Sequence, residues 1–268
     1  KDKFLLFGEV FDGDDVQVGA FTQTDMLDGN VDFAAKYRVF DGVFKDGGAT
    51  TAVSELYAER QTNWGAEPQA GGVDLAPRDM PLGFLDNHDV ARFLWNEPDD
   101  SALRIALVHL LTREGLPVLY YGTEQGYDGG NDPANREYLR WSGYDQDHPL
   151  YQWIQAITRV RAETAPLRRG DINYVWTTEH TGTEQDAGIL AYERVFEGEH
   201  AIVVINTNAT QSSSTSFGGA TMGVAAPAGT TFRDALPSDT ARSYTVQVDG
   251  SLLVELGPRE AVVLVQGG

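Results

Sequence analysis

Two carboxylates and an imidazole, side chains that can carry protons, directly follow apolar runs in this 268-residue chain. Glu9 follows the run Phe4-Leu5-Leu6-Phe7-Gly8, and Asn87-His88-Asp89 follows Gly83-Phe84-Leu85-Asp86. An apolar run predicts a buried strand, so polar residues at its end should leave the core and face a site. This pattern is typical of strands that end at the active site of an enzyme.

A third apolar run, Leu116 to Gly122, repeats the design and leads to a polar loop, residues 129–136. That loop holds Asp132 and Arg136. Three strands that release polar residues at their ends, with helical stretches between them, favour a (β/α) barrel, in which such residues gather at one face. The fold class expected is therefore α/β.

Composition limits the classes of partner. Forty acidic residues against 20 basic ones give a formal charge of −20 and a pI near 4.4. This charge repels nucleic acid and anionic membrane surfaces, and a neutral substrate suits it better. The acidic, lysine-poor composition is also compatible with adaptation to high salt. The chain has no cysteine, which excludes disulfides and thiolate metal sites.

The first 165 residues alternate between strand and helix patterns. Strands are expected at 4–8, 30–33, 82–86 and 117–121. Helices are expected at 34–44, 51–62, 101–114 and 149–163, the third of them capped by Asp100 or Ser101. Four strands with four helices amount to half of a complete (β/α)8 barrel, which needs eight of each.

The periodicity changes to two after Ala165-Pro166-Leu167. The stretches 189–196, 201–206 and 261–265 read as strands separated by Gly, Ser and Thr clusters. We therefore predict two domains, a half-barrel over 1–165, corresponding to barrel strands 5 to 8, and an antiparallel β-sandwich over 166–268. The sandwich is expected to pack on the helix over 149–163 and to carry no catalytic residue.

Several motifs together resemble one enzyme family. Phe7-Gly8-Glu9-Val10, Phe84 to Asp89 and Tyr120 to Gln125 are similar, in order and spacing, to segments of the α-amylase family of retaining glycoside hydrolases. The resemblance extends to residues 131–137 and to Trp141-Ser142-Gly143-Tyr144, and is greatest to fungal-type α-amylases and their bacterial relatives. It covers residues 4–161 well, whereas over the sandwich it is only architectural.

The resemblance implies a role for each matched residue. Glu9 matches the general acid/base, which needs a raised pKa, and Asp89 matches the carboxylate that binds sugar hydroxyls and stabilises the oxocarbenium-like transition state. His88 would hydrogen-bond the same sugar. Asn87 would either touch substrate or orient Asp89.

The loop residues have two interpretations each. By resemblance, Asp132 and Arg136 contact glucose units on the non-reducing side of the cut, but four residues apart they could also form a plain ion pair. Asp12 matches a position on the leaving-group side, or is a solvated Asp-Gly turn. Tyr120, Tyr121 and Trp141 could stack on glucose rings or belong to a core, and His109 is expected to be structural.

A retaining mechanism also needs a carboxylate nucleophile. In the family this is an aspartate in an Arg-x-Asp pattern on the strand before Gly8-Glu9-Val10, and no segment of this chain matches that strand. The earlier Asn-His segment and the inserted domain that supplies most calcium ligands are also unmatched. Calcium is thus expected as a family cofactor whose ligands lie mostly outside this chain, and no metal ligand is assigned here.

The resemblance implies endo-hydrolysis of α-1,4-glucosidic bonds in starch and maltooligosaccharides by an extracellular enzyme. Alternatives are a transglycosylase or maltogenic enzyme, or a non-catalytic glucan-binding fragment. The isolated chain is expected to be inactive. Its partner would be an upstream half-barrel held noncovalently, or a second copy through the exposed strand edges.

Overall fold

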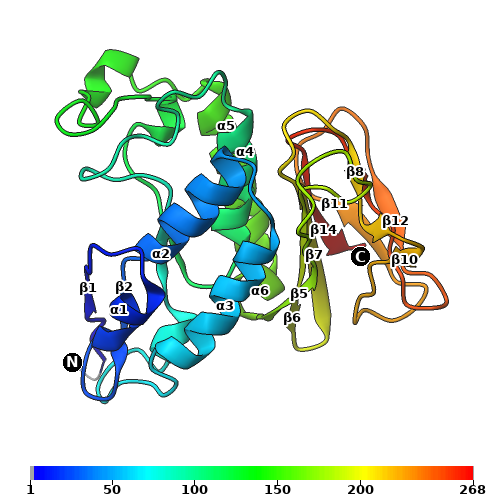
Figure 1. Ribbon diagram of the computed structural model, residues 1–268, viewed down its shortest axis with the longest axis horizontal. Helices are drawn as coiled ribbons and strands as arrows, with labels where there is room; N and C mark the ends of the chain where they lie inside the picture. Colours follow the sequence, from blue (N-terminus) through cyan, green and yellow to red (C-terminus); the bar gives the residue numbers. More distant parts are fainter. Residues whose placement is uncertain (1–2, 268) are drawn as a thin grey trace.

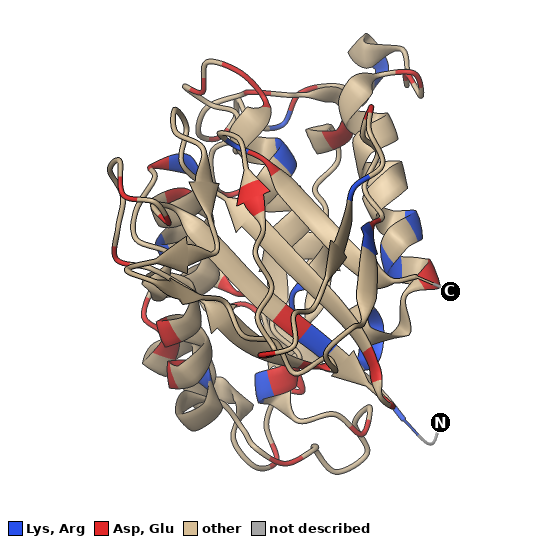
Figure 2. Cartoon of the chain, turned by 90° about the vertical axis from the view of Figure 1, so that its right-hand side faces the viewer, with Lys and Arg blue, Asp and Glu red and all other residues tan. Residues whose placement is uncertain are grey.

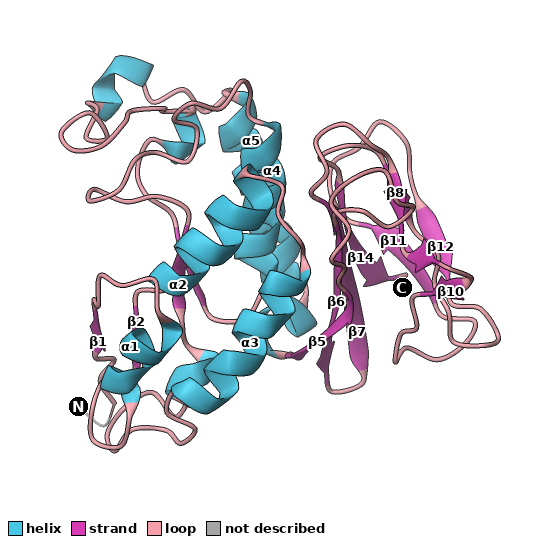
Figure 3. Ribbon diagram, viewed as in Figure 1, coloured by secondary structure: helices cyan, strands magenta, loops and turns pink. Residues whose placement is uncertain are grey.

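The computed structural model describes residues 3–267. Helices cover one side of a set of short strands in the N-terminal part, and an antiparallel sheet forms the C-terminal part (Figures 1 and 3). Acidic residues are spread over loops and helix faces rather than collected in one patch (Figure 2). Within the described residues, no helix is both long enough and apolar enough to cross a membrane.

Four short strands of the N-terminal part pair in chain order and in parallel. Strand β1 pairs with β2, a bridge joins Val31 to Leu82, and β3 pairs with β4. The strands are β1 (Phe7–Gly8), β2 (Gly29–Asn30), β3 (Leu82–Phe84) and β4 (Leu116–Val118). Parallel pairing places all four C-terminal ends on one side, as a shared site requires.

These strands are shorter than the apolar runs suggest. Residues 4–6 precede β1 and lie outside any strand. The backbone of Leu6 instead pairs with Asp28, whose N–H donates to the Leu6 carbonyl and whose side chain accepts from the Leu6 N–H. Apolar composition identified the segment, but the pairing partner sets the strand length.

Helices cover the outer face of these strands. Three of them, α3, α4 and α5, have the expected bounds within two residues, and α4 ends two residues early, at Thr112. The bounds of the helical elements are α1 (Asp15–Gly19), η1 (Ala20–Thr22), α2 (Phe33–Ala35), η2 (Lys36–Lys45), α3 (Thr51–Asn63), η3 (Pro77–Asp79), α4 (Ser101–Thr112), η4 (Thr123–Gln125), η5 (Leu139–Ser142), α5 (Pro149–Glu163) and α6 (Ala165–Arg169).

Two details of the helices differ from expectation. The helix expected at 34–44 is α-helical only over α2 and continues as the π-helix η2, whose end is closed by a bond from the Asp46 N–H to the Asp41 carbonyl. Asp100 occupies the N-cap position of α4 as expected, but its side chain makes no capping hydrogen bond and pairs with Arg104. The side chain of Asp99 accepts from the Ser101 N–H.

A buried ion network joins the helices to the strands. Asp32, which caps α2, accepts hydrogen bonds from Arg60 of α3 at 2.8 Å and from Arg113, next to α4, at 2.9 Å. Glu114 contacts both guanidinium groups. Paired in this way, the buried charges avoid the large cost of an isolated ion.

A six-stranded antiparallel sheet follows the short helix α6, in the order β12-β11-β14-β7-β6-β5. Its strands are β5 (Asp171–Trp176), β6 (Ile189–Phe196), β7 (Glu199–Asn206), β11 (Thr231–Asp234), β12 (Ser243–Thr245) and β14 (Ala261–Gln266). Two short pairs accompany it, β8 (Ser213–Ser214) with β13 (Glu255–Leu256), and β9 (Ser216–Phe217) with β10 (Ala220–Thr221).

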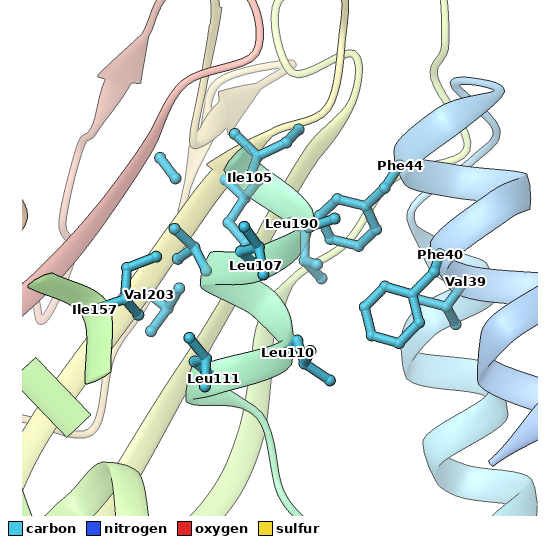
Figure 4. Close-up of a cluster of buried hydrophobic side chains, with 14 of the residues drawn as sticks. Val39, Phe40, Phe44, Ile105, Leu107, Leu110, Leu111, Ile157, Leu190 and Val203 are labelled. Carbon is cyan, nitrogen blue, oxygen red and sulfur yellow. The ribbon is translucent and has the colours of Figure 1, made fainter. Parts of the chain in front are cut away.

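Side chains along the central strands point alternately to the two faces of the sheet, and both faces are buried. Leu190 and Val203 face the helices and share a core with Ile157 of α5 and Phe40 of η2 (Figure 4). Their neighbours Ile189 and Val204 face the opposite side, where a second core contains Leu256 of β13. Trp153 and Val160 of α5 also pack against the first core, so the expected packing of the sheet on α5 is observed.

Candidate active site

The turn after β3 is shaped by a buried carboxylate. Asp86 accepts hydrogen bonds from the Phe93 N–H at 2.9 Å and from the Thr123 hydroxyl at 3.0 Å. Burial raises the pKa of Asp86, opposed by these bonds and by the charge of Arg92. Asp86 thus ties the two ends of the turn to the segment after β4.

The side chain of Asn87 is engaged by its own turn. Its Oδ1 accepts from the Asp89 N–H at 2.8 Å and from the Val90 N–H at 3.1 Å. Because these two hydrogen bonds fix the backbone of the turn, they also fix the direction in which the Asp89 side chain points. This geometry favours the interpretation that Asn87 orients Asp89.

Four of the residues singled out from sequence come together. The Nε2 atom of His88 lies 3.2 Å from Asp89 Oδ2, and a guanidinium nitrogen of Arg136 lies 3.7 Å from the other oxygen, Oδ1. Arg136 Nε lies 2.7 Å from Asp132 Oδ1 and donates to the His88 carbonyl at 3.3 Å. The ion pair between Asp132 and Arg136 therefore exists and at the same time borders Asp89. Either function of this pair is compatible with its position.

Two residues that the sequence interpretation did not single out hold these loops in place. Asn135 is fully buried and donates to the carbonyls of Asn87 and Val90. Arg92, whose side chain is inaccessible to solvent, donates to the Tyr121 carbonyl at 2.6 Å and pairs with Glu137. The only local signal was that Asn135 lies within the matched segment 131–137, whereas Arg92 comes three residues after the segment that ends at Asp89.

Tyr120 and Tyr121 pack against the Arg92 guanidinium group instead of forming part of the hydrophobic core. The guanidinium carbon of Arg92 lies 4.1 Å from the ring centre of Tyr120 and 5.0 Å from that of Tyr121. Burial and the neighbouring Tyr121 raise the pKa of Tyr120 to about 12. Trp141 is largely exposed, in edge contact with Tyr138 at 5.0 Å between ring centres.

The residues after β1 lie on the other flank of the site. Glu9 is exposed, one residue after β1 ends. The ring of Phe11 packs on Phe33 at 4.4 Å, and Asp12 accepts from the Asp14 N–H at 2.8 Å, as in an Asx turn. Phe11 and Asp89 line one cavity of about 420 Å³, which brings the loop after Glu9 to the side of Asp89.

His109 is structural, as expected. It is buried on α4, stacks on Phe44 at 5.2 Å and has Nδ1 3.3 Å from the Tyr192 hydroxyl. Burial lowers the pKa of His109 to about 3, so the ring is neutral at neutral pH.

Calcium stays a prediction for this chain, because its expected ligands lie mostly outside residues 3–267. Over that range, no cluster of three or more His, Cys, Asp or Glu side chains is arranged to hold a metal ion. No step below relies on a calcium ion.

Comparison with known proteins gives the family. The family model described as alpha amylase, catalytic domain, matches residues 1–157, more than half of the chain. The chain belongs to the alpha-amylase family. The match contains all seven residues singled out as candidate site residues, and it ends within α5.

Curated members of the alpha-amylase family match at modest identity. A beta/alpha-amylase of Paenibacillus polymyxa is 32% identical over 271 residues, which covers 98% of this chain and 20% of the relative. A cyclomaltodextrin glucanotransferase of Geobacillus stearothermophilus is 34% identical over 183 residues, covering 67% of this chain and 24% of the relative. The chain thus spans about a fifth to a quarter of the length of these relatives.

Solved structures of the alpha-amylase family share the fold. The gamma-cyclomaltodextrin glucanotransferase of alkalophilic Bacillus clarkii superposes with a TM-score of 0.77 at 27% identity, over 99% of this chain and 36% of that one. The alpha-amylase of Geobacillus thermoleovorans, solved with acarbose, gives 0.78 at 21% identity, over 100% and 54%. At 21% identity the likeness concerns the fold alone.

Proposed function

We propose that this chain is the C-terminal part of an α-amylase that hydrolyses internal α-1,4-glucosidic bonds with retention. The observation that carries the proposal is the cluster formed by His88, Asp89, Asp132 and Arg136 at the C-terminal side of the parallel strands. In this proposal the four strands are strands 5 to 8 of a (β/α)8 barrel, and the sheet over 171–266 belongs to a β-sandwich.

The chemistry assigned to each residue rests on its match to the family motifs, and its position in the structure is compatible with that role. Asp89, with 36% of its side chain exposed, can accept hydrogen bonds from sugar hydroxyls and stabilise positive charge on the sugar ring. His88 and Arg136 border its two oxygens and limit how the carboxylate can turn. Glu9 would donate the proton to the glycosidic oxygen and later accept one from water.

The nucleophile is expected on an upstream strand outside this chain. We therefore propose that the isolated chain does not turn over starch, because removal of one member of a catalytic set costs several powers of ten in rate. A separately produced upstream half of a family catalytic domain would supply that carboxylate. An extracellular setting, suited to polymeric starch, is part of the same proposal.

The test is complementation. We expect the chain mixed with the upstream half of the Paenibacillus polymyxa relative to hydrolyse starch, with the product anomer followed by NMR to establish retention. Glu9→Gln should abolish this activity, whereas Glu67→Gln, at an exposed position remote from the strands, should not. Starch hydrolysis by the purified chain alone, lost on changing an aspartate other than Asp89, would contradict the assignment.

A transglycosylase is the second candidate. Several relatives, including the one from Geobacillus stearothermophilus, are named cyclomaltodextrin glucanotransferases. Chromatography of the products of the complemented enzyme separates the cases, since transfer yields cyclic or longer glucans and hydrolysis yields shorter linear ones; a maltogenic enzyme would release mainly maltose. A chain that binds glucan and gives no turnover after complementation would be a non-catalytic binding fragment.

A further inference from the structure

The side chain of Arg92 joins the loop after β3 to both ends of the polar loop 129–137. It is fully buried, and its Nε donates to Glu137 Oε2 at 3.1 Å. The backbone N–H of Arg92 donates to the Gly129 carbonyl at 2.9 Å, and its Nη1 donates to the Tyr121 carbonyl at 2.6 Å. One buried residue near Asp89 therefore contacts the start and the end of a loop that lies about 40 residues further along the chain.

Glu137 closes the base of this loop. While one of its oxygens pairs with Arg92, the other, Oε1, accepts from the Gly129 N–H at 2.8 Å. A Cβ added at Gly129 would lie 2.0 Å from the Ala134 carbonyl oxygen and 2.6 Å from Glu137 Oε1, so only glycine fits there. Hydrogen bonds to charged groups are stronger than neutral ones, and these hold the loop closed at its base.

A second contact joins the loop to the turn that carries Asp89. Asn135 is fully buried, and its amide donates to the Val90 carbonyl at 2.8 Å. The loop is thus attached to the segment 87–92 at two separate points. Asp132 and Arg136 cannot shift relative to Asp89 unless buried hydrogen bonds break, which is costly.

The orientation of the Arg92 guanidinium group is fixed by three aromatic rings. Its central carbon lies 4.1, 5.0 and 5.7 Å from the ring centres of Tyr120, Tyr121 and Tyr127. Arginine suits this place because it is planar and donates several hydrogen bonds in fixed directions, whereas lysine would supply only the charge.

The residues that Arg92 holds in place are exposed. The side chains of Asp89, Arg136 and Asp132 are 36%, 47% and 55% exposed. A rigid, buried base beneath polar groups that face solvent is the arrangement that keeps a binding site preorganised. The contacts of Arg92 therefore bear on the geometry of the site as well as on stability.

We propose that Arg92 is a positioning residue that couples the binding of a remote glucose unit at Asp132 and Arg136 to the action of Asp89 at the bond that is cleaved. The catalytic part of this inference rests on the proposed function. Binding energy gained at a remote unit raises the rate only if it is used to hold the reacting unit in place. A rigid connection between the two loops supplies this link, and Arg92 with Glu137 forms it.

Hydrogen exchange of the isolated chain tests the connection without turnover. Arg92→Lys should raise amide exchange by about tenfold or more in both 87–93 and 129–137, because the two loops then open together. Arg140→Lys is the matched control, at an exposed position just after the loop, and should leave both segments unchanged. A rise in only one of the two segments, or an equal rise in α4 and α5, would contradict a local connection.

Substrate length tests the coupling in the complemented enzyme. Arg92→Lys should lower kcat/KM for maltoheptaose by about tenfold or more, chiefly through kcat, and change it little for maltotriose, which is too short to use the remote contacts. Asp132→Asn should have the same selective effect. The double variant should lose little more than either single variant, because both changes remove the same coupling.

The outcomes separate this inference from the catalytic assignment. Faster exchange confined to the two loops would support the positioning role even if the complemented mixture is inactive and the proposed function fails. Unchanged exchange in Arg92→Lys, or an equal loss of kcat/KM for maltoheptaose and maltotriose, would overturn the inference even if complementation restores starch hydrolysis.

Discussion

Asp86 is a buried carboxyl group that holds an exposed turn in place. It accepts hydrogen bonds from the Phe93 N–H and the Thr123 hydroxyl, and the three residues that follow it carry the amide, imidazole and carboxylate of the candidate site. Because both donors are buried, each would lack a partner if the carboxylate were removed. The local conformation of residues 87–89 therefore depends on a residue that touches no substrate.

Asp86→Ala should destabilise the chain by about 2 to 4 kcal/mol, because two buried donors lose their acceptor. Asp86→Asn should cost less, since its Oδ1 can still accept from Phe93 and its amide can donate to the Thr123 oxygen. Urea unfolding measures both, with Asp128→Asn as an exposed control in the segment after β4. Equal stability of Asp86→Ala and wild type would refute this account.

Because the pKa of Asp86 is raised, the difference in unfolding free energy between wild type and Asp86→Asn should depend on pH. Stability linked to its protonated form is fully present below the ordinary pKa of a carboxyl and is lost as the pH rises through the raised value. Asparagine does not ionise, so Asp86→Asn should gain on wild type as the pH rises. Repeating the unfolding experiment at acidic and neutral pH would show this trend.

His109 affects the pH dependence of stability in the opposite direction from Asp86. Its pKa is lowered to about 3, so the unfolded chain binds a proton more readily than the folded chain between that value and the ordinary pKa of about 6.5. Stability linked to His109 is therefore present above about 6.5 and is lost as the pH falls toward about 3.

We predict that His109→Gln removes this part of the pH dependence. The free energy of unfolding of the wild type should fall by several kcal/mol across that window, since each pKa unit corresponds to about 1.4 kcal/mol. Denaturant unfolding at a series of pH values measures it. A slope in that pH window that persists unchanged in His109→Gln would be evidence against the prediction.

At the scale of elements, helices were predicted better than strands. The bounds of α5 follow from local signals, since Pro149 stands at its first position and the imidazole of His148 accepts from the Leu150 N–H. The strands β1 to β4 have only two or three residues each, because their length depends on neighbours far away in the sequence.

In the candidate site too, features set by local sequence could be predicted, and features set by distant contacts could not. The residue types and their order along the chain identified His88, Asp89, Asp132 and Arg136, which the fold brings together. The roles of Asn135 and Arg92 could not be foreseen, because each contacts backbone atoms about 30 to 50 residues away. Nor did apolar spacing reveal that η2 would be a π-helix.

The element η2 is held at its C-terminal end by the sheet. Arg259, in the turn between β13 and β14, donates to the carbonyl of Phe44 and, at 3.3 Å, to that of Lys45. These carbonyls have no partner within the helix, so the guanidinium acts as a C-terminal cap. The sheet thereby fixes the helix that lines the cavity beside Asp89.

Arg259→Ala should cost about 1 to 3 kcal/mol, because buried carbonyls lose a charged donor. It should also raise amide hydrogen exchange over residues 43–48 selectively, an effect that a general loss of stability would not produce. Arg233→Ala, at an exposed position on β11, is the control. Uniformly faster exchange across the whole chain would argue against a cap.

At the scale of the whole molecule, the chain has a closed side and an open side. The sheet and helices share one continuous core, in which Ile157 contacts the same cluster as Leu190 and Val203. The parallel strands, in contrast, carry exposed apolar side chains at both ends of their order. Leu6 and Phe7 next to β1 are 49% and 52% exposed, and Val118 and Leu119 next to β4 are 42% and 41% exposed.

Exposed apolar strands with unpaired edges favour association, because backbone groups and side chains there gain partners only from another chain. We predict that the isolated chain forms dimers or larger species at micromolar concentration, measured by analytical ultracentrifugation. Phe7→Lys combined with Val118→Lys should shift it toward monomer, since like charges at both edges oppose pairing. An upstream half-barrel should compete with self-association and give a 1:1 complex if it closes the barrel. A wild-type chain that stays monomeric at high concentration and binds no upstream half would contradict the prediction that these strand edges associate with another chain.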